Sequence, residues 1–528
     1  MDLIKVVDPK VNVKGDVEKN HLVFVGGERV TYTVSTADSW DNLMTNATWS
    51  IVPPSDKTII DRNVKVRAYF EVEVDQPLDI GTHDALRQLP LSSLVDVTQV
   101  QINGEAISDN TGNMLHAMMC YGNTAEDRDA HLSESPAMPD AFQKYEDQLE
   151  IGNARSPLND YGETYGETPR GGFEYKLSAD LKKLTCTVTE PLFLSPFQQY
   201  QSMDEGFINV NTLRVALRFK SQLDRILSHS IAPGVPQITS VTTKFTQAPE
   251  LLINYITPSI TQQLPELQVL PYNQMQQYIR NVPDMVADPD IKVTVISDTI
   301  RLSVIPEKIY LYCAHNEQSK NFKVSDSFLS IEKLSISWGN QSGLLSSASQ
   351  QQLYRLSREN GLNMSYPAFS KYRGSVICLR MGKDIGLQAN EAPGVNGSYN
   401  IQVEMTVRNY NTEIFKPTFY MCVCNTGTFS IGANSARASI GNLTGDMVLA
   451  ARGSNNEMDY HEAFSGGKGK FFQGLKRFIH KVSGVVGKLA VPVSTAFGAP
   501  ELGMAVKKGA DLAHSLSRGG RLSGGGRM

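Results

Sequence analysis

The sequence lacks any run of about 18 apolar residues, which is the length that a helix needs to cross a bilayer. Its first ten residues, MDLIKVVDPK, also lack the apolar segment of a secretory signal. These two absences predict a protein that is neither secreted nor membrane-spanning and that is made in the cytoplasm or nucleus.

Cysteine is scarce, and its distribution argues against disulfides. The six cysteines are scattered through apolar, strand-like segments, at Cys120, Cys186, Cys313, Cys378, Cys422 and Cys424. This pattern is typical of reduced thiols packed in a core. Cys422 and Cys424 lie two residues apart in a predicted strand and so share one face, which favours a structural role over a metal site.

Motifs that carry catalysis are absent too. None of the nine histidines belongs to an HExxH or HxH motif or has a cysteine at zinc spacing, and the sequence has no Walker A loop and no GxSxG. The acidic group Glu126, Asp127 and Asp129 favours a solvated loop over a cation site. We therefore predict no catalytic residue, no metal site, no cofactor and no enzyme.

One enzymatic alternative stays open at this point. Four acids in the stretch 122–175, namely Asp140, Asp147, Asp160 and Glu163, could supply the paired carboxylates of a glycosidase. A carbohydrate-binding or hydrolytic β-sandwich protein is therefore an alternative to a structural protein.

The sequence does contain abundant period-two alternation of apolar and polar residues. Alternation places the apolar side chains on one face of a strand, as a half-buried sheet requires. Strands predicted in this way outnumber the short helices, which indicates an all-β chain of antiparallel sandwiches. The expected strands are His21–Val25, Val30–Val34, Val64–Val74, Val97–Ile102, Thr185–Val188, Leu213–Phe219, Ile238–Phe245, Ile291–Ile296, Ile300–Ile305, Ile309–Cys313, Phe328–Trp338, Ser375–Leu379, Tyr399–Tyr410 and Phe419–Val423.

One local pattern occurs twice. Residues 97–121 and 333–356 each contain an alternating strand, a turn, a cluster of polar capping residues and a short helix. In the first copy Asn103-Gly104 is a strong turn dipeptide, and Asn110 or Thr111 can cap the helix. In the second copy Ser349 and Gln352 form a capping box. The repeat predicts two similar β-domains in tandem.

The predicted domain limits follow from this repeat and from composition. An N-terminal arm, 1–40, precedes a first domain, 41–250, which contains the long loop 122–175. A proline-rich connection, 251–272, leads to a second domain, 273–450. A glycine-rich tail, 451–528, follows.

The tail differs from the body in charge. Residues 463–528 hold eleven lysines and arginines and two acids, a net charge of +9 in a chain whose net charge is −5. An amphipathic helix is expected over about 470–489, with a mixed apolar and basic set of residues: Phe471, Phe472, Leu475, Lys476, Arg477, Phe478, Ile479, Lys481 and Val482. Apolar area combined with cations favours an anionic membrane surface or a docking site on a partner, and nucleic acid is a further alternative.

Several longer motifs resemble a known family. APELLINYITPSITQQLP, RSPLNDYGETYGETPRGGF, LSISWGNQSGLLSSASQQQLYRLSRENG and GSVICLRMGKDIGL are similar to segments of double jelly-roll major capsid proteins. The resemblance covers roughly residues 40–445. It is nearest to polinton-like virus and adintovirus capsid proteins, in the lineage of adenovirus hexon and tectivirus capsid proteins.

The resemblance implies two tandem eight-stranded jelly rolls in each chain. It also implies homotrimers of pseudo-hexagonal outline that build an icosahedral shell around double-stranded DNA, in contact with penton and minor capsid proteins. The protein would then be a virion component. A minor capsid or vertex protein of the same fold is the runner-up.

The tail has a resemblance of its own. Residues 464–478 look like the start of the membrane-lytic internal protein of adenoviruses, in which a Gly-Gly cleavage site precedes an amphipathic helix. The maturation protease of those viruses prefers Met, Ile or Leu, then any residue, then Gly-Gly. Gly524-Gly525 fits this pattern, and Gly466-Gly467 fits apart from Phe464. The resemblance implies a tail peptide that such a protease releases.

Overall fold

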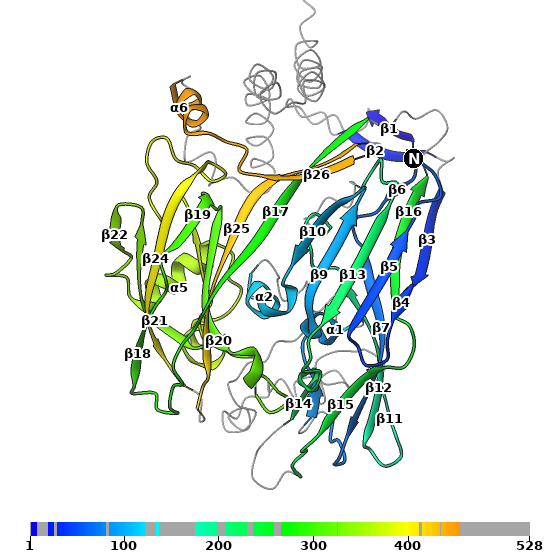
Figure 1. Ribbon diagram of the computed structural model, residues 1–528, viewed down its shortest axis with the longest axis horizontal. Coiled ribbons are helices and arrows are strands. Elements are labelled where there is room, and N and C mark those ends of the chain that lie inside the picture. The colour runs from blue at the N-terminus through cyan, green and yellow to red at the C-terminus, as the bar shows by residue number, and fades with distance from the viewer. Residues whose placement is uncertain are drawn as a thin grey trace, which may run out of the picture. The chain divides into compact units, whose positions relative to one another are not determined.

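The computed structural model describes residues 2–7, 20–25, 29–80, 84–121, 134–136, 175–197, 206–229, 236–257, 264, 266–324, 326–410, 414–432 and 435–453. Two antiparallel β-sandwiches follow one another in the chain (Figure 1), and both belong to one compact unit, residues 1–448. The prediction of an all-β chain with two sandwiches is confirmed.

The first sandwich consists of two sheets. One has the order β10-β9-β13-β5-β4, with bounds Glu105–Asp109, Val95–Ile102, Leu213–Phe219, Asn46–Ile51 and Ser39–Trp40. The other has the order β11-β12-β7-β16-β3, with bounds Tyr175–Leu177, Lys183–Pro191, Lys65–Val74, Glu250–Thr257 and Arg29–Thr36. β15, Val241–Phe245, pairs with β7, and β6, Ile59–Ile60, pairs with β16.

The second sandwich repeats this plan. One sheet has the order β17-β25-β20-β23, with bounds Leu267–Asn281, Pro417–Gly432, Lys308–His315 and Ile377–Arg380. The other has the order β18-β24-β21-β22, with bounds Lys292–Ile296, Asn396–Arg408, Ser330–Trp338 and Gln341–Leu344. β26, Ser435–Ile440, pairs with β25, and β19, Ile300–Val304, pairs with β24.

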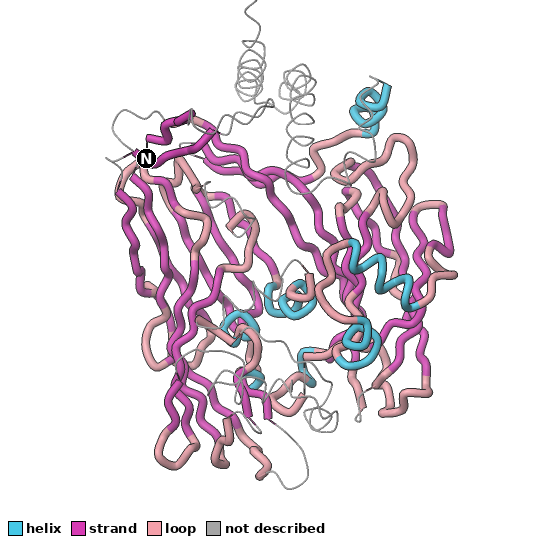
Figure 2. The backbone as a smooth tube through the Cα atoms, turned by 180° about the vertical axis from the view of Figure 1, so that it is seen from behind, coloured by secondary structure: helices cyan, strands magenta, loops and turns pink. Residues whose placement is uncertain are grey.

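Smaller elements complete the described residues. β1, Asp2–Val7, pairs with β2, Asn20–Val25, and β8, Asp84–Leu86, pairs with β14, Leu227–His229. Short helices fill the connections (Figure 2): α1 Pro90–Leu94, α2 Thr111–Met118, η1 Asp224–Ile226, η2 Glu317–Ser319, α5 Gln350–Glu359, η3 Ala368–Tyr372 and α6 Gly445–Gly453.

The two sandwiches match strand by strand. The order β3-β16-β7-β12 in the first corresponds to β17-β25-β20-β23 in the second, and β5-β13-β9-β10 corresponds to β18-β24-β21-β22. Two packed four-stranded sheets with this connectivity form an eight-stranded jelly roll. The predicted pair of jelly rolls is therefore confirmed.

The sequence repeat corresponds to one structural unit. In the first copy β9 and β10 form a hairpin that leads into α2, and in the second β21 and β22 form a hairpin that leads into α5. Asn103 and Gly104 both adopt positive φ, 46° and 92°, as a tight hairpin turn requires. The capping box is present: the backbone N–H of Gln352 donates to Ser349 Oγ, and the backbone N–H of Ser349 donates to Gln352 Oε1.

Two details differ from the sequence-based expectations. Asn110 occupies the N-cap of α2 without a side-chain capping bond, and the Thr111 hydroxyl donates to Thr98 Oγ1 instead, at 2.8 Å. Strands also occupy both ends of the predicted connection 251–272, because β16 continues to Thr257 and β17 begins at Leu267. Pro271 is tolerated within β17 because that strand lies at a sheet edge, where a missing amide costs little.

Each sandwich has its own apolar core. The first is built around Trp49 and Phe70, and the second around Tyr312, Phe369 and Phe419, all fully buried. In β7 and β13, buried residues alternate with more exposed ones, as predicted. β20 and β25 are instead buried on both faces over most of their length. Another part of the protein must therefore pack against the outer face of β20 and β25.

Candidate functional site: the junction between the two jelly rolls

A buried ionic cluster joins the two jelly rolls. Asp326, in the loop after β20, accepts from Arg87 Nη1 at 3.1 Å and from Arg225 Nη2 at 2.6 Å. Arg87 directly follows β8 and Arg225 lies in η1, so both arginines belong to the first jelly roll. Their side chains are each 1% exposed. One carboxylate of the second jelly roll is thus held by two guanidinium groups of the first.

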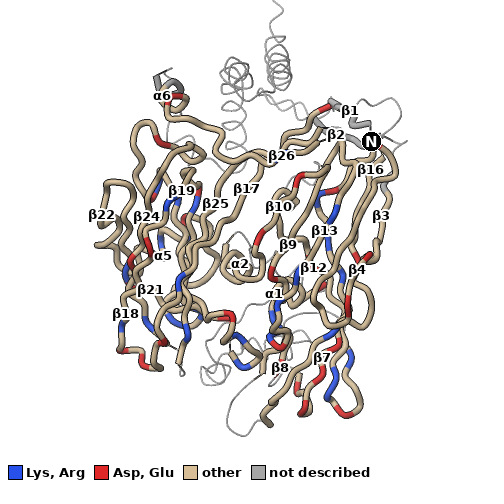
Figure 3. The backbone as a smooth tube through the Cα atoms, in the orientation of Figure 1, with Lys and Arg blue, Asp and Glu red and all other residues tan. Residues whose placement is uncertain are grey.

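Glu317, in η2, extends the cluster. Its Oε2 lies 2.9 Å from Lys220 Nζ and 3.3 Å from Arg225 Nη1, and its Oε1 accepts from Lys320 Nζ at 2.6 Å. Arg225 therefore bridges both acids. In Figure 3 the loop after β20 carries both signs of charge on the side that faces the first jelly roll.

The electrostatics of this cluster follow from burial and from the mixture of charges. Burial by itself would raise the pKa of Asp326, but Arg225 and Arg87 outweigh it and hold that pKa well below its ordinary value. The pKa of Glu317 is lowered in the same way by Lys320, Lys220 and Arg225. Burial and the nearby Arg225 lower the pKa of Lys220 to about 7. Both acids are therefore ionised at neutral pH, and removing either leaves buried cations without compensation.

Helix α2 is the second element of the junction. Although it follows β10 of the first jelly roll, Met114 and Ala117 pack in the core of the second. Its backbone accepts from side chains of the second jelly roll: Tyr312 Oη donates to the Asn113 carbonyl at 3.0 Å and Arg373 to the His116 carbonyl at 3.3 Å. α2 thus covers the outer face of the sheet that contains β20 and β25.

The second jelly roll contributes in return to the first core. Leu270 and Tyr272 of β17 pack there, together with Phe429 and Ile431 of β25. Polar contacts join β26 and β17 to the first jelly roll: the Ala438 amide donates to Glu105 Oε1 at 2.9 Å, the Ile208 amide to Gln268 Oε1 at 3.0 Å and the Asn273 amide to Ser195 Oγ at 2.9 Å. Because each core contains side chains from the other jelly roll, the two cannot rotate freely.

A small polar cavity lies beside the ionic cluster. Its lining includes Asn113, His116, His315 and Lys320, and it has room for about one water molecule. His116 Nε2 lies 3.2 Å from Asp326 Oδ2 but outside hydrogen-bond geometry, and His315 Nδ1 has no hydrogen-bond partner among the described residues. Burial lowers the pKa of each histidine to about 3, so both are neutral at pH 7.

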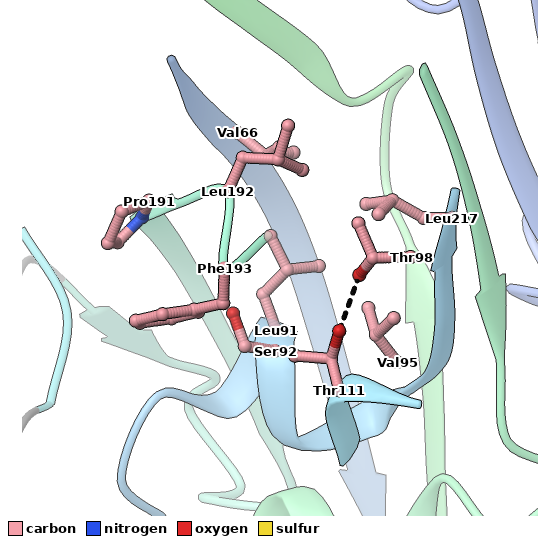
Figure 4. A pocket seen from close by; sticks show the side chains of 10 residues that line it. All are labelled: Val66, Leu91, Ser92, Val95, Thr98, Thr111, Pro191, Leu192, Phe193 and Leu217. Carbon is pink, nitrogen blue, oxygen red and sulfur yellow. Dashed lines mark hydrogen bonds between the residues drawn. The ribbon is translucent and has the colours of Figure 1, made fainter. Parts of the chain in front are cut away.

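A second cavity lies within the first jelly roll (Figure 4). It is mostly apolar, lined by residues such as Leu91, Val95 and Leu217, and the hydrogen bond between Thr111 and Thr98 joins two of its lining residues. It too has room for about one water molecule, which is far less than a substrate cleft needs.

The sequence-predicted site residues lie outside the described residues. These are the cleavage glycines Gly466, Gly467, Gly524 and Gly525 and the helix residues Phe471, Phe472, Leu475, Lys476, Arg477, Phe478, Ile479, Lys481 and Val482. The four acids considered for a glycosidase, Asp140, Asp147, Asp160 and Glu163, also lie outside the described residues. Among the described residues no group of three or more His, Cys, Asp or Glu could hold a metal ion, and no helix is long and apolar enough to cross a membrane.

The six cysteines are buried in the core, as the sequence predicted. All six are buried and none forms a disulfide, and burial raises the pKa of Cys422 and of Cys424 to about 12. Thiols with so high a pKa are neither metal ligands nor nucleophiles at neutral pH, which supports their packing role.

The junction itself was missed from the sequence. Arg87 is a single charge in apolar surroundings, in ALRQL, whereas Arg225 follows Asp224 in LDRIL. A lone charge in such a context indicates a buried, paired side chain, because an unpaired one would be too costly. The partner could not be named, because Asp326 lies 239 positions from Arg87.

We expect Asp326→Asn to destabilise the protein by roughly 3–5 kcal/mol, because Arg87 and Arg225 each lose a buried carboxylate partner, although Arg225 keeps Glu317. Urea unfolding followed by far-UV circular dichroism measures this. Asp298→Asn is the matched control, since Asp298 pairs with Arg280 at 3.2 Å but is 79% exposed. The control should change stability by less than about 0.5 kcal/mol. Equal effects of the two substitutions would contradict a stabilising role for the cluster.

We also expect acid to weaken the junction through His116 and His315. Their folded-state pKa of about 3 lies below the ordinary 6.5, so the unfolded chain binds protons that the folded one excludes. Stability should therefore fall as the pH drops below about 6.5, by roughly 2 kcal/mol per histidine at pH 5.

The test compares wild type with the double variant His116→Gln/His315→Gln at pH 7.5 and pH 5. Burial raises the pKa of Asp109 to about 7, which acts in the opposite direction, but this contribution is common to both proteins. The variant should lose less stability than wild type between the two pH values. Parallel losses would show that the two histidines do not titrate with unfolding.

The sequence of both jelly rolls matches those of known capsid proteins. Residues 2–256 match the model of the Sputnik virophage major capsid protein first domain, and residues 275–373 and 370–427 match that of the major capsid protein V20 C-terminal domain. The chain is 29% identical over 531 residues to the putative capsid protein V20 of Sputnik virophage, covering 93% of this chain and 88% of that protein.

Solved structures agree. The structure of the Sputnik virophage, determined by cryo-electron microscopy, contains a chain that superposes with a TM-score of 0.77 at 27% identity, covering 88% of this chain and 97% of that one. The mavirus major capsid protein has the same fold, with a TM-score of 0.67 at 16% identity, covering 87% and 99%.

These matches span both jelly rolls and set aside the alternatives of a hydrolytic or carbohydrate-binding β-sandwich and of a minor capsid or vertex protein. The junction is therefore an architectural site, and the protein is a structural component of the virion that assembles with itself, not an enzyme. The chain belongs to the double jelly-roll major capsid proteins of the virophage type, which build the icosahedral shells of double-stranded DNA viruses.

Proposed function

We propose that three copies of this chain associate into a capsomer of pseudo-hexagonal outline and that these capsomers tile the shell. The observation that carries the proposal is the strand-by-strand match of the two jelly rolls within one chain. Three chains with two equivalent jelly rolls each supply six similar units, so a three-fold assembly can occupy a six-fold lattice position.

The junction supports this proposal mechanically. Because the cores are shared and the ionic cluster is buried, each chain presents its two jelly rolls at a fixed angle. A fixed angle is what a closed ring requires, since a heterologous contact closes only if the rotation between units is constant.

We propose a separate role for the tail. The basic, amphipathic segment around 470–489 would bind an anionic membrane or dock on the inner face of the shell, with viral DNA as a further partner. A maturation protease specific for Gly-Gly would release it after Gly467 and trim the chain after Gly525. Penton and minor capsid proteins are the other proposed partners.

Within the capsid lineage, a specific kinship with polinton-like virus and adintovirus proteins is likewise a proposal. It rests on the motifs quoted above and on the adenovirus-like Gly-Gly motif of the tail.

The capsomer predicts a defined particle in solution. Size-exclusion chromatography with light scattering should give about three times the chain mass of 58.2 kDa. Negative-stain microscopy should show hexagonal capsomers or shells. A stable monomer with no tendency to assemble would contradict the trimer.

The tail proposal predicts two breaks that mass spectrometry of purified virions can detect, after Gly467 and after Gly525. Gly519-Gly520 is an internal control: its first position holds the small polar Ser517, where Gly466-Gly467 has the large apolar Phe464 and Gly524-Gly525 has Leu522, so it should stay intact. Virions that contain only full-length chains would rule out the cleavage.

A further inference from the structure

The junction between the jelly rolls holds more buried cations than acids. Its basic side chains, each less than a tenth exposed, are Arg87, Lys220, Arg225, Lys320 and Arg373. The acids that act on them are Asp326, Glu317 and the partly exposed Asp224. The cations therefore outnumber the acids, even when Asp224 is counted.

This excess of positive charge has a cost, because a buried charge is tolerated only when it is compensated. The effect is visible on Lys320. Burial, together with Arg225, lowers the pKa of its ammonium group, although Glu317 opposes the change. A further negative charge beside Lys320 would reduce the cost of burying these cations.

The polar cavity of the junction lies at the place where such a charge would act. Lys320 lines it, and only one of the three protons of Lys320 Nζ is donated to Glu317 Oε1. His116 lines it from α2, which belongs to the first jelly roll, and His315 lines it from the end of β20 in the second. The cavity is thus shared by both jelly rolls.

Several polar atoms of the cavity lining have no hydrogen-bond partner among the described residues. They are Asn113 Oδ1, His116 Nε2 and His315 Nδ1, and both histidines are 7% exposed. Either nitrogen of a neutral imidazole can carry the proton, so each ring can present an N–H group to the cavity. The Asn113 amide can do the same, because rotation exchanges its oxygen and nitrogen. The cavity can therefore supply several hydrogen-bond donors besides Lys320.

Asp326 also lines the cavity, but its charge is already compensated. Its Oδ2 accepts from Arg87 at 3.1 Å and its Oδ1 accepts from Arg225 at 2.6 Å. This carboxylate therefore does not exclude a second anion on the side of Lys320.

The size of the cavity restricts the anion. Room for about one water molecule is too little for sulfate, phosphate or a carboxylate. A water molecule could take up the same hydrogen bonds, but it would leave the excess of positive charge unchanged. Chloride is only slightly larger than water and carries the missing negative charge.

We infer that the polar cavity of the junction is a chloride site, in which N–H groups of His116, His315 and Lys320 hold one halide ion. Because the ligands come from both jelly rolls, the ion ties one to the other. The folded chain is then more stable with chloride than without it. The site lies within one chain and does not depend on the proposed trimer.

The first test is urea unfolding of the full-length wild-type chain over a series of chloride concentrations. Ionic strength is kept constant with gluconate, an anion far too large for the cavity. A ligand that binds only the folded state raises the ratio of folded to unfolded protein. Once chloride exceeds its dissociation constant, that ratio should rise about tenfold for each tenfold increase in chloride.

Two lysine variants assign the response to the cavity. Lys320→Met should abolish it, because the variant lacks the cation that faces the ion. Lys292→Met is the matched control: Lys292 Nζ also pairs with a glutamate, Glu332, at 2.8 Å, but its side chain is 50% exposed. K292M should keep the full chloride response of wild type.

Bromide locates the ion directly. Wild-type protein purified and crystallised in sodium bromide should give an anomalous diffraction peak beside His116 Nε2 and His315 Nδ1. The apolar cavity of the first jelly roll is an internal control, since it has room for one water molecule but none of its lining residues is charged. It should show no bromide. This measurement needs no variant, so it decides even if K320M does not fold.

A bromide peak in the junction cavity, with a chloride response that K292M keeps and K320M lacks, supports the site. A wild-type stability that does not change with chloride overturns it. So does a junction cavity that contains water without a bromide peak, and so does a folded K320M that responds to chloride as wild type does.

Discussion

The carboxylate of Asp326, held between Arg87 and Arg225, is the interaction on which the arrangement of the two jelly rolls depends. A buried ion pair contributes little net stability compared with apolar residues of the same volume, but breaking it is costly. Its value here is directional: the two guanidinium groups come from one jelly roll and the acid from the other. A misaligned junction would leave these charges buried and unpaired, so the cluster excludes other angles between the jelly rolls.

Apolar packing reinforces that choice of angle. Met114 of α2 lies in the second core, and Leu270 and Phe429 lie in the first. Neither core is complete without the other jelly roll, so they are expected to fold as one cooperative unit. A rigid pair is a suitable building block for a shell, because small errors in angle would accumulate around the proposed ring of six jelly rolls.

The sequence was sufficient where a strand depends only on its own sheet. β13 was predicted with its observed limits, Leu213–Phe219, because one face is buried and the other is solvated. The capping box at Ser349 was equally local. The first residues of β17, 267–272, were assigned to the connection because they include Pro271, which a strand tolerates only at an edge. The Arg87–Asp326 contact was out of reach because nothing local links residues 239 positions apart.

The two equivalent strands β7 and β20 differ in the polarity of their outer faces. β7, KVRAYFEVEV, keeps polar residues on its outer face, whereas β20, KIYLYCAH, is apolar on both faces. The cover of β20 comes from the same chain and arrives during folding, so that face can be as apolar as a core. No described residue gives the outer face of β7 such a cover, so this face meets water. Such a surface has to stay soluble, which limits its apolar area to a narrow strip such as that of Tyr32 and Val34 on β3 and Leu252 on β16. The two copies of the fold thus differ because folding buries the outer face of β20, whereas the outer face of β7 still meets water in the folded chain.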